Sequence, residues 1–144
     1  RLESLIMAKN EYTRPVPKMR GFAAEFYGYC KKHELRFQRC TNCKSWRHIP
    51  RDMCAKCGSF GWEWAPSTGK GKLFSWTTAM QPMLPQFADM VPYSPVIVEL
   101  EEGVRMLSWL TDVEESELRI DLPLQVVFDD VTPEVTLPKF RARA

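Results

Sequence analysis

The chain has 144 residues, of which 26% are charged and 44% hydrophobic, and a formal net charge of +2. This length suits one domain, or a small domain with an appendage, and no apolar run approaches the roughly 20 residues that span a bilayer. No secretory signal is visible in a chain that begins at Arg1. Five cysteines, four of them in metal-type spacing, are typical of a reducing compartment and predict a cytoplasmic protein.

Charge is distributed unevenly along the chain. Residues 31–72 contain ten basic and three acidic residues, a net charge of +7, whereas residues 86–134 contain two basic and twelve acidic residues, a net charge of −10. A basic segment followed by an acidic one predicts that the two parts of the chain bind different partners.

The first predicted elements are an extended segment, residues 1–20, and a helix within residues 21–34. Two prolines in Arg14–Lys18 push their preceding residues out of the helical region. Residues with helical spacing on one face follow in Gly21–Lys32: Phe22, Phe26, Tyr29 and Cys30. A strand at Leu35–Gln38 then leads into a ribbon over residues 35–66.

After the ribbon the hydrophobic period changes to two, which predicts a β domain over residues 67–144. Five segments have the character of strands: Gly69–Met80, Pro95–Leu100, Val104–Leu110, Leu124–Asp130 and Glu134–Phe140. Five strands and a long loop after the first, Gln81–Tyr93, fit an OB-type Greek-key barrel. Pro138 predicts an edge position for the last strand, and Asp112–Leu118 a single helical turn. The fold expected is therefore mainly β: N-terminal helix, zinc ribbon and five-stranded barrel.

Two C-x-x-C pairs with ten residues between them form the clearest motif: Cys40, Cys43, Cys54 and Cys57. One tight turn presents both sulfurs of a pair to the same ion, and the spacer lets the second pair return to the first. This spacing predicts a structural zinc site with four thiolate ligands. Iron in a rubredoxin-like site and a redox dithiol are the alternatives. Four protein ligands leave no open position, which argues against catalysis by the metal.

We expect the histidines, the fifth cysteine and the paired aspartates to have structural rather than catalytic roles. We expect His48 to be a surface or knuckle histidine rather than a ligand or base, because the ligand count is already full. His33 is expected to cap the helix or lie in a turn, and Cys30 to be half-buried. Asp129 and Asp130 are adjacent on a strand, point to opposite faces and should not form a catalytic pair.

The order of motifs resembles a known family. A short helix, "ELRFQRCTNC", "RHIPRDMCAKCGS", "WEWAPSTGKGKLFSWT", a loop ending in "PY" and "VIVELEEGVRM" follow one another between about Gly21 and Phe140. This combination is similar to the zinc-ribbon/OB-fold proteins, a domain-of-unknown-function family associated with acyl-CoA metabolism. The resemblance implies a rubredoxin-like zinc ribbon, an OB fold and no chemistry of its own. It also implies a hetero-oligomer with a thiolase-fold enzyme: a thiolase, acyltransferase, hydroxymethylglutaryl-CoA synthase or retro-aldolase.

Two positions depart from the family pattern. His33 and Asp121 stand where the family usually has glycine. Asn, Asp and His adopt positive φ at modest cost, so we expect local turn changes and an intact fold.

The resemblance makes a CoA thioester the expected ligand of the complex. Its phosphates need a cationic mouth, and its pantetheine arm needs a narrow, mainly apolar channel. Residues that suit the mouth are Arg47, Arg51, Lys70 and Lys72, and those that suit the channel are Met80, Phe87, Met90 and Tyr93. The alternatives are a solvated ribbon face for the cations and ordinary loop packing for the aromatic side chains.

The sequence features bear on three possible functions. The favoured one is a non-catalytic accessory subunit of an acyl-CoA enzyme, required by its partner and docked through aromatic residues of the helix, the ribbon and the loop. The alternative is a nucleic-acid-binding zinc-ribbon/OB module, which the acidic barrel disfavours because it repels phosphate. A free-standing enzyme is disfavoured because the sequence has no recognisable nucleophile–base set or open metal site.

Overall fold

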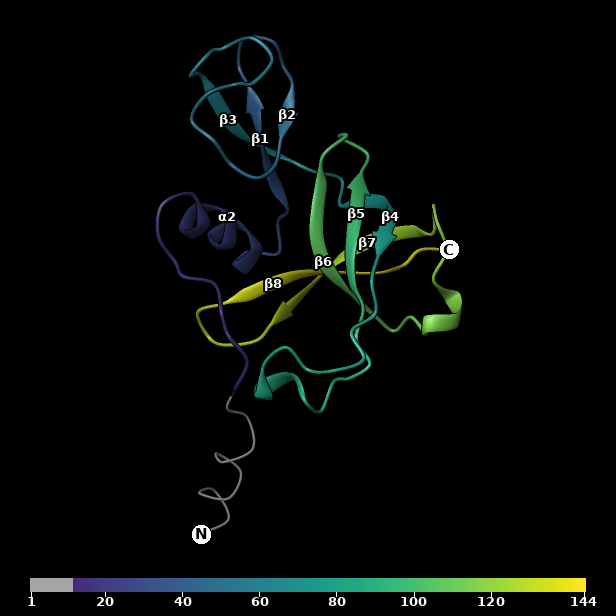
Figure 1. Cartoon of the computed structure of the whole chain (residues 1–144). Coiled ribbons are helices and arrows are strands. Elements are labelled where there is room, and N and C mark those ends of the chain that lie inside the picture. Colours follow the sequence, from purple (N-terminus) through teal and green to yellow (C-terminus); the bar gives the residue numbers. More distant parts are fainter. Residues whose placement is uncertain (1–11) are drawn as a thin grey trace.

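The computed structural model describes residues 12–144, so residues 1–11 of the expected extended segment lie outside the described part (Figure 1). In this part of the chain the expected fold is confirmed: one α-helix, a zinc ribbon and a closed OB-type barrel follow one another. The helix is α2 (Phe22–Lys31), and the ribbon strands are β1 (Arg36–Cys40), β2 (Trp46–Arg47) and β3 (Trp62–Pro66). The barrel strands are β4 (Lys70–Trp76), β5 (Pro95–Leu100), β6 (Arg105–Thr111), β7 (Pro123–Asp130) and β8 (Thr136–Ala142). Two short 3₁₀ turns are η2 (Pro85–Phe87) and η3 (Glu115–Glu117).

Helix α2 lies across one end of the barrel, beside the ribbon (Figure 1). Phe26 and Cys30, one turn apart, are both buried, so the expectation that Cys30 is only half-buried is wrong. The neighbouring strand β1 and the barrel together cover a helix face that the sequence pattern alone leaves half-open. His33, just after the helix, has φ 59, and Asp121 has φ 65. Both therefore adopt the positive φ expected at the two positions that depart from the family's glycines.

The ribbon is a three-stranded antiparallel sheet in the order β2-β1-β3. Its central strand β1 pairs with β3 from Arg36 opposite Pro66 to Cys40 opposite Trp62. Alternation along β1 directs Phe37 toward the helix, where its ring lies 6.5 Å from that of Phe26. The ribbon is thus connected to the helix by aromatic packing as well as by the chain.

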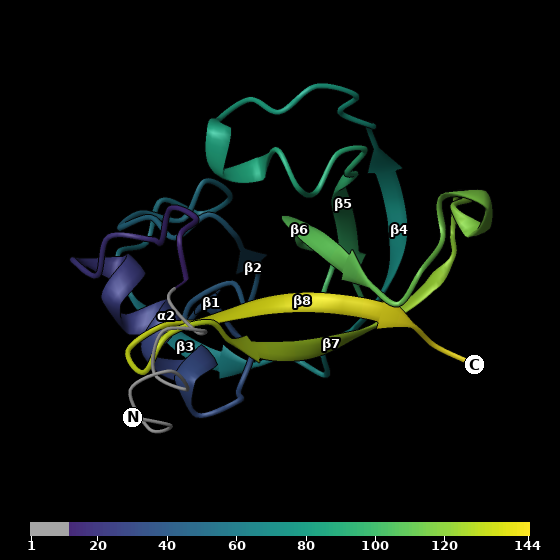
Figure 2. The ribbon, with the colours of Figure 1, turned by 90° about the horizontal axis from the view of Figure 1, so that it is seen from below.

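The barrel closes in the order β4-β5-β6-β8-β7, with β4 pairing again with β7 (Figure 2). Closure requires a parallel contact between β6 and β8, at Leu110 opposite Phe140 and Thr111 opposite Arg141. The edge position expected from Pro138 is therefore wrong, because β8 pairs with β7 on one side and β6 on the other. Pro138 is tolerated because it lies before the β6–β8 pairs, and its carbonyl accepts a hydrogen bond from the Ser108 hydroxyl at 2.8 Å.

One hydrophobic core continues from the ribbon into the barrel. Its members from the helix and β1 region are Phe26, Cys30, Leu35 and Phe37, and they join the inward-facing side chains of all five barrel strands. Burial of this shared surface is the main driving force that holds the two parts together.

Residues 67–69 connect the ribbon to the barrel and are bonded on both sides. The amide of Ser67 donates to the Leu35 carbonyl at 2.8 Å, and the Ser67 hydroxyl and the Thr68 amide both donate to the Glu102 carboxylate. Gly69 has φ +70, and a Cβ there would lie 2.3 Å from a methyl carbon of Val126. Glycine is therefore required at this position by both its backbone angle and its close approach to the barrel.

Within residues 12–144, no helix has the length and apolar character needed to cross a membrane.

Candidate functional site

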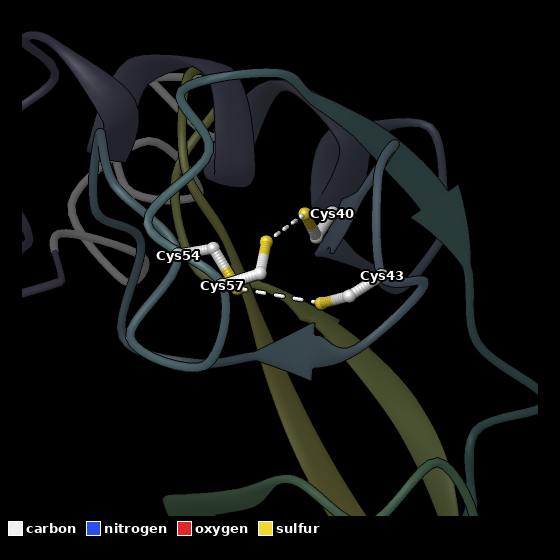
Figure 3. Close-up of side chains that lie close together, drawn as sticks. All are labelled: Cys40, Cys43, Cys54 and Cys57. Atoms are coloured by element: carbon white, nitrogen blue, oxygen red, sulfur yellow. Dashed lines mark hydrogen bonds between the residues drawn. The ribbon is translucent and has the colours of Figure 1, made fainter.

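The four cysteines come together at the end of the ribbon away from the helix. Their sulfur atoms all lie within 4.8 Å of one another, with 3.6 Å between the sulfurs of Cys40 and Cys57 and 3.6 Å between those of Cys43 and Cys54 (Figure 3). Four sulfurs placed tetrahedrally about 2.3 Å from a zinc ion would be roughly 3.8 Å apart. The cluster therefore has the dimensions and donor set that zinc requires.

The two halves of the cluster are built alike. Lys44 donates its amide to the Cys40 carbonyl at 3.0 Å, and Gly58 donates to the Cys54 carbonyl at 2.9 Å. Both residues follow the second cysteine of their pair and have positive φ, 63 and 73 respectively. The tight turn of each pair thus comes from the same backbone geometry, although only one turn has the glycine that such angles favour.

The surroundings of the cluster favour thiolates. The Ser45 hydroxyl lies 3.3 Å from the Cys54 sulfur. This hydrogen bond and those from the amides of Cys57 and Lys56 lower the pKa of the Cys54 thiol to about 5. A thiolate is the form that binds a metal. Because protein sulfurs would take all four positions, the cluster suits a structural role and leaves none for a substrate.

Of the basic residues expected at the mouth of a CoA channel, two are already engaged. Arg47 donates from Nε to the Gln38 side-chain oxygen and from Nη2 to the Arg51 carbonyl, each at 2.7 Å. Lys72 lies 3.4 Å from the Asp121 carboxylate and 3.8 Å from that of Glu99. Arg51 and Lys70 are exposed.

The aromatic residues of the long loop pack onto the barrel. The rings of Phe87 and Tyr93 are 5.8 Å apart, and that of Tyr93 lies 5.3 Å from Trp109 of β6. They line an apolar groove of about 370 Å³ whose other walls come from α2, β6 and β8. Of the two loop methionines expected beside them, Met90 is half-buried and Met80 is 72% exposed.

The structure does not bring all the expected channel residues together. The ribbon, with Arg47 and Arg51, and the long loop, with Phe87 and Tyr93, lie at opposite ends of the molecule (Figure 1). The basic and apolar sets therefore do not form one continuous channel within this chain. Within the sets, Phe87 and Tyr93 share the groove of the loop, while Arg47 and Arg51 share a pocket in the ribbon.

Sequence reasoning missed residues that complete the groove. Tyr27 reaches it from the helix, Trp109 from β6, and Leu137 and Pro138 from β8. Trp109 carried a signal, since the inward-facing Met106 and Ser108 alternate with Leu107 and Trp109 along β6. No local signal placed Tyr27 there, because that contact depends on how the helix lies against the barrel.

The two histidines occupy different environments. His48 is half-buried, with its ring 5.2 Å from that of Phe37 and 5.5 Å from that of Phe26. Of the two positions expected for it, surface or knuckle, the structure excludes a fully exposed one. Burial lowers the pKa of His48 to about 4, which makes it neutral at neutral pH. His33 lies in the expected turn, 3.1 Å from the Asp130 carboxylate, while Asp129 contacts Lys139 at 2.6 Å instead.

Comparisons with known proteins give a consistent result. Residues 29–63 match the model of the ChsH2 rubredoxin-like zinc ribbon domain, and residues 64–129 match that of the ChsH2 C-terminal OB-fold domain. A chain described as "Ltp2-ChsH2(DUF35) aldolase" superposes with a TM-score of 0.78 at 34% identity, covering 90% of this chain and 98% of that one.

Two curated relatives are longer proteins. A probable enoyl-CoA hydratase alpha subunit of Thermomonospora curvata is 35% identical over 92% of this chain and 41% of its own length. The 3-oxo-4,17-pregnadiene-20-carboxyl-CoA hydratase alpha subunit of Mycobacterium tuberculosis is 35% identical over 74% of this chain and 33% of its own length. The chain thus spans less than half of each of these two relatives.

Proposed function

Because the chain belongs to the DUF35 family and joins a ChsH2-type zinc ribbon to a ChsH2-type OB-fold domain, we propose that it is a non-catalytic accessory subunit of an acyl-CoA enzyme. Its partner is a thiolase-fold protein, and the two form a hetero-oligomer that binds a CoA thioester. The observation that carries this proposal is the match along almost the whole of a DUF35 chain whose description names an aldolase. The names of the two hydratase alpha subunits support the same class of substrate.

The chemistry of the described residues supports a role without catalysis. Cys30, the cysteine outside the ribbon cluster, is fully buried, and burial raises the pKa of its thiol to about 12. A thiol in that state is a poor nucleophile. His48 is held between aromatic rings, and His33 pairs with a carboxylate next to a buried threonine. We therefore assign the four-cysteine cluster to a structural zinc ion and the turnover to the partner.

Exposed apolar side chains support a docked partner. Two on the long loop are exposed, Met83 by 82% and Leu84 by 43%, as is Met80 just before it, by 72%. Leu107 of β6, which lines the groove, is exposed by 67%. Methionine and aromatic residues are enriched at interfaces. Phe26 of the helix and Trp64 of the ribbon, by contrast, pack against the core. The partner surface therefore centres on the loop and its groove, where Phe87 and Tyr93 would border the acyl channel of the complex.

Co-expression with a thiolase-fold partner tests the proposal. We expect the two chains to elute together in size-exclusion chromatography and the complex to turn over an acyl-CoA. Met83→Glu should weaken the association at least about tenfold without unfolding the chain, because it places a charge at an apolar contact while its side chain is exposed in the free chain. Ile120→Glu is the matched control, since Ile120 is 60% exposed on a different loop.

Two results would contradict the proposal. A monomeric elution beside a fully active partner would remove the assembly. Wild-type kinetics in complexes carrying Phe87→Ala and Tyr93→Ala would remove the channel role of the groove while leaving the assembly intact.

A further inference from the structure

A second pocket, of about 240 Å³, lies in the ribbon between β2 and the second cysteine pair. Trp46, His48 and Ile49 line it on the side of β2, and Met53 and Ala55 line it on the side of the second pair. Ser45 and the cluster cysteine Cys54 also belong to the lining, and three cations complete it: Arg47, Arg51 and Lys56. No carboxylate is among these lining residues. The ribbon, which holds this pocket, lies at the opposite end of the molecule from the long loop (Figure 1).

Among the described residues, the three cations form no ion pair with a carboxylate. None of the ion pairs formed within residues 12–144 includes Arg47, Arg51 or Lys56, whereas Lys72 on the barrel has two carboxylate partners. The pocket also lies within the basic stretch of the chain, residues 31–72. Three clustered cations outnumber the one thiolate of the lining, Cys54, and attract anions over distances of about a Debye length.

Arg47 is fixed in place before any ligand arrives. Its Nε and Nη2 atoms hold the Gln38 side chain and the Arg51 carbonyl, and its remaining nitrogen, Nη1, is buried without a partner. An unpaired buried donor on a charged group is costly, and such groups usually have a ligand or water. The guanidinium thus supplies positive charge at a defined position.

Arg51 combines a fixed backbone with a free side chain. Its amide donates to the Gln38 side-chain oxygen at 2.8 Å, and its carbonyl accepts from Arg47. Its side chain and that of Lys56 are exposed at the pocket. Two exposed cations beside one fixed guanidinium can contact an anion from different directions.

We propose that this ribbon pocket is a binding site for a phosphate group. A water molecule takes about 30 Å³ of liquid volume, so the pocket has room for a tetrahedral oxyanion and several waters. Arginine and lysine are the side chains that bind phosphate, through charge-assisted hydrogen bonds. The phosphate comes either from the free anion or from a phosphate monoester on CoA. Naming CoA rests on the proposed function, whereas the phosphate site itself does not.

Nuclear magnetic resonance of the zinc-loaded full chain at low ionic strength tests the site. The probes are inorganic phosphate, CoA and 3′-dephospho-CoA, and the readouts are the indole N–H of Trp46 and the amide of Arg51. We expect saturable shifts of both signals. Arg51→Gln and Lys56→Gln should each weaken binding about tenfold, since each removes one charge-assisted contact and leaves the backbone bonds of the ribbon unchanged. Lys44→Gln, which removes an exposed cation of the same ribbon outside the pocket, should change binding less than twofold.

The probes separate the two sources. Saturation by CoA but not by 3′-dephospho-CoA identifies the phosphate monoester of CoA, and equal affinity for inorganic phosphate identifies the free anion. Two results would overturn the proposal: no shift of Trp46 or Arg51 with either inorganic phosphate or CoA, or shifts that persist unchanged in both Gln variants. Neither result bears on co-elution with a thiolase-fold partner, so failure of the phosphate site is distinct from failure of the accessory function.

Discussion

Between Cys40 and Cys57 the ribbon buries two side chains, the cluster cysteines Cys40 and Cys54, whereas every barrel strand buries side chains in a common core. Strand β5 alone places three apolar side chains inside, Val96, Val98 and Leu100. The ribbon knuckles therefore have little apolar burial to offset the entropy of ordering them, and the barrel has much.

This difference shows where each part of the chain derives its stability. A segment as short as the ribbon cannot bury enough surface alone, and metal ligation is a common substitute. The boundary between stabilisation by apolar burial and stabilisation by metal ligation lies inside the ribbon itself. Leu35, just before the central strand, and Phe37 within it belong to the barrel core, while Cys40, three residues after Phe37, belongs to the cysteine cluster.

The largest effect should follow from Cys54→Ala. Structural zinc contributes roughly 10–16 kcal/mol to folding in zinc-finger peptides. We therefore expect this variant to lose its zinc and the ordered structure of the ribbon knuckles. The barrel should stay folded, so its amide signals should remain well dispersed in nuclear magnetic resonance spectra. Elemental analysis should find one zinc per wild-type chain and none in the variant, and amide spectra report the folding. Cys30→Ala is the matched control and should retain its zinc. Native amide chemical shifts for the ribbon of Cys54→Ala would show that the ribbon does not depend on metal ligation for its stability.

The next largest effect tests the boundary residue Phe37. Phe37→Ala should lower the free energy of unfolding by about 3–5 kcal/mol, because it opens a cavity in the shared core. Phe60→Ala, in the same ribbon but at a side chain 71% exposed, should change it by less than about 0.5 kcal/mol. Urea denaturation measures both. Equal losses in the two variants would show that Phe37 does not connect the ribbon to the barrel core.

A smaller effect concerns pH and His48. Burial lowers the pKa of His48 to about 4, while in the unfolded chain a histidine titrates near about 6.5. Its folded pKa is depressed, so its contribution to stability is complete above about pH 6.5 and is lost as the pH falls toward about 4.

Replacement of the ring isolates this contribution. Between about pH 7 and about pH 5.5, the wild type should lose about 1 kcal/mol more than His48→Phe. Urea unfolding at the two pH values measures the difference, and zinc release at low pH affects both proteins alike. Parallel pH profiles would show that His48 is solvated.

The smallest effect lies where the helix end meets the barrel. The hydroxyl of Thr136, and then His33, hold the pKa of Asp130 below its ordinary value. The stability this carboxylate supplies is therefore present above about pH 4 and is lost as the pH falls through its lowered pKa. Thr136→Val should raise the pKa of Asp130 toward its ordinary value, and His33→Ala should raise it less. Carboxyl titration by nuclear magnetic resonance measures both shifts, and an unchanged pKa in Thr136→Val would contradict the assignment.

Features encoded within a few residues were predictable from the sequence. The spacing of the cysteines predicted a cluster that the two short turns then assemble. Positive φ at His33 and Asp121 followed from the family resemblance, which has glycine at both positions, and from side chains that tolerate such angles. The alternation of apolar residues located the five barrel strands, because each strand has one face turned to the core.

Features that depend on distant segments were not predictable in the same way. Cys30 and His48 are covered by elements remote in sequence, so their own neighbours understate their burial. Pro138 was misplaced because barrel closure, a contact with β6, decides whether β8 is an edge. Arg47 has the chemistry of a ligand-binding residue, yet its hydrogen bond to Gln38 exists only once two ribbon strands pair.

The connection at residues 67–69 has a consequence for association with a partner. Ser67 is bonded to the ribbon through Leu35 and to the barrel through Glu102, and Gly69 lies against Val126. A connector held on both sides has few conformations left to lose. A protein that grips the ribbon and the barrel together therefore meets a preorganised surface, and its affinity is not reduced by the entropy of freezing a hinge.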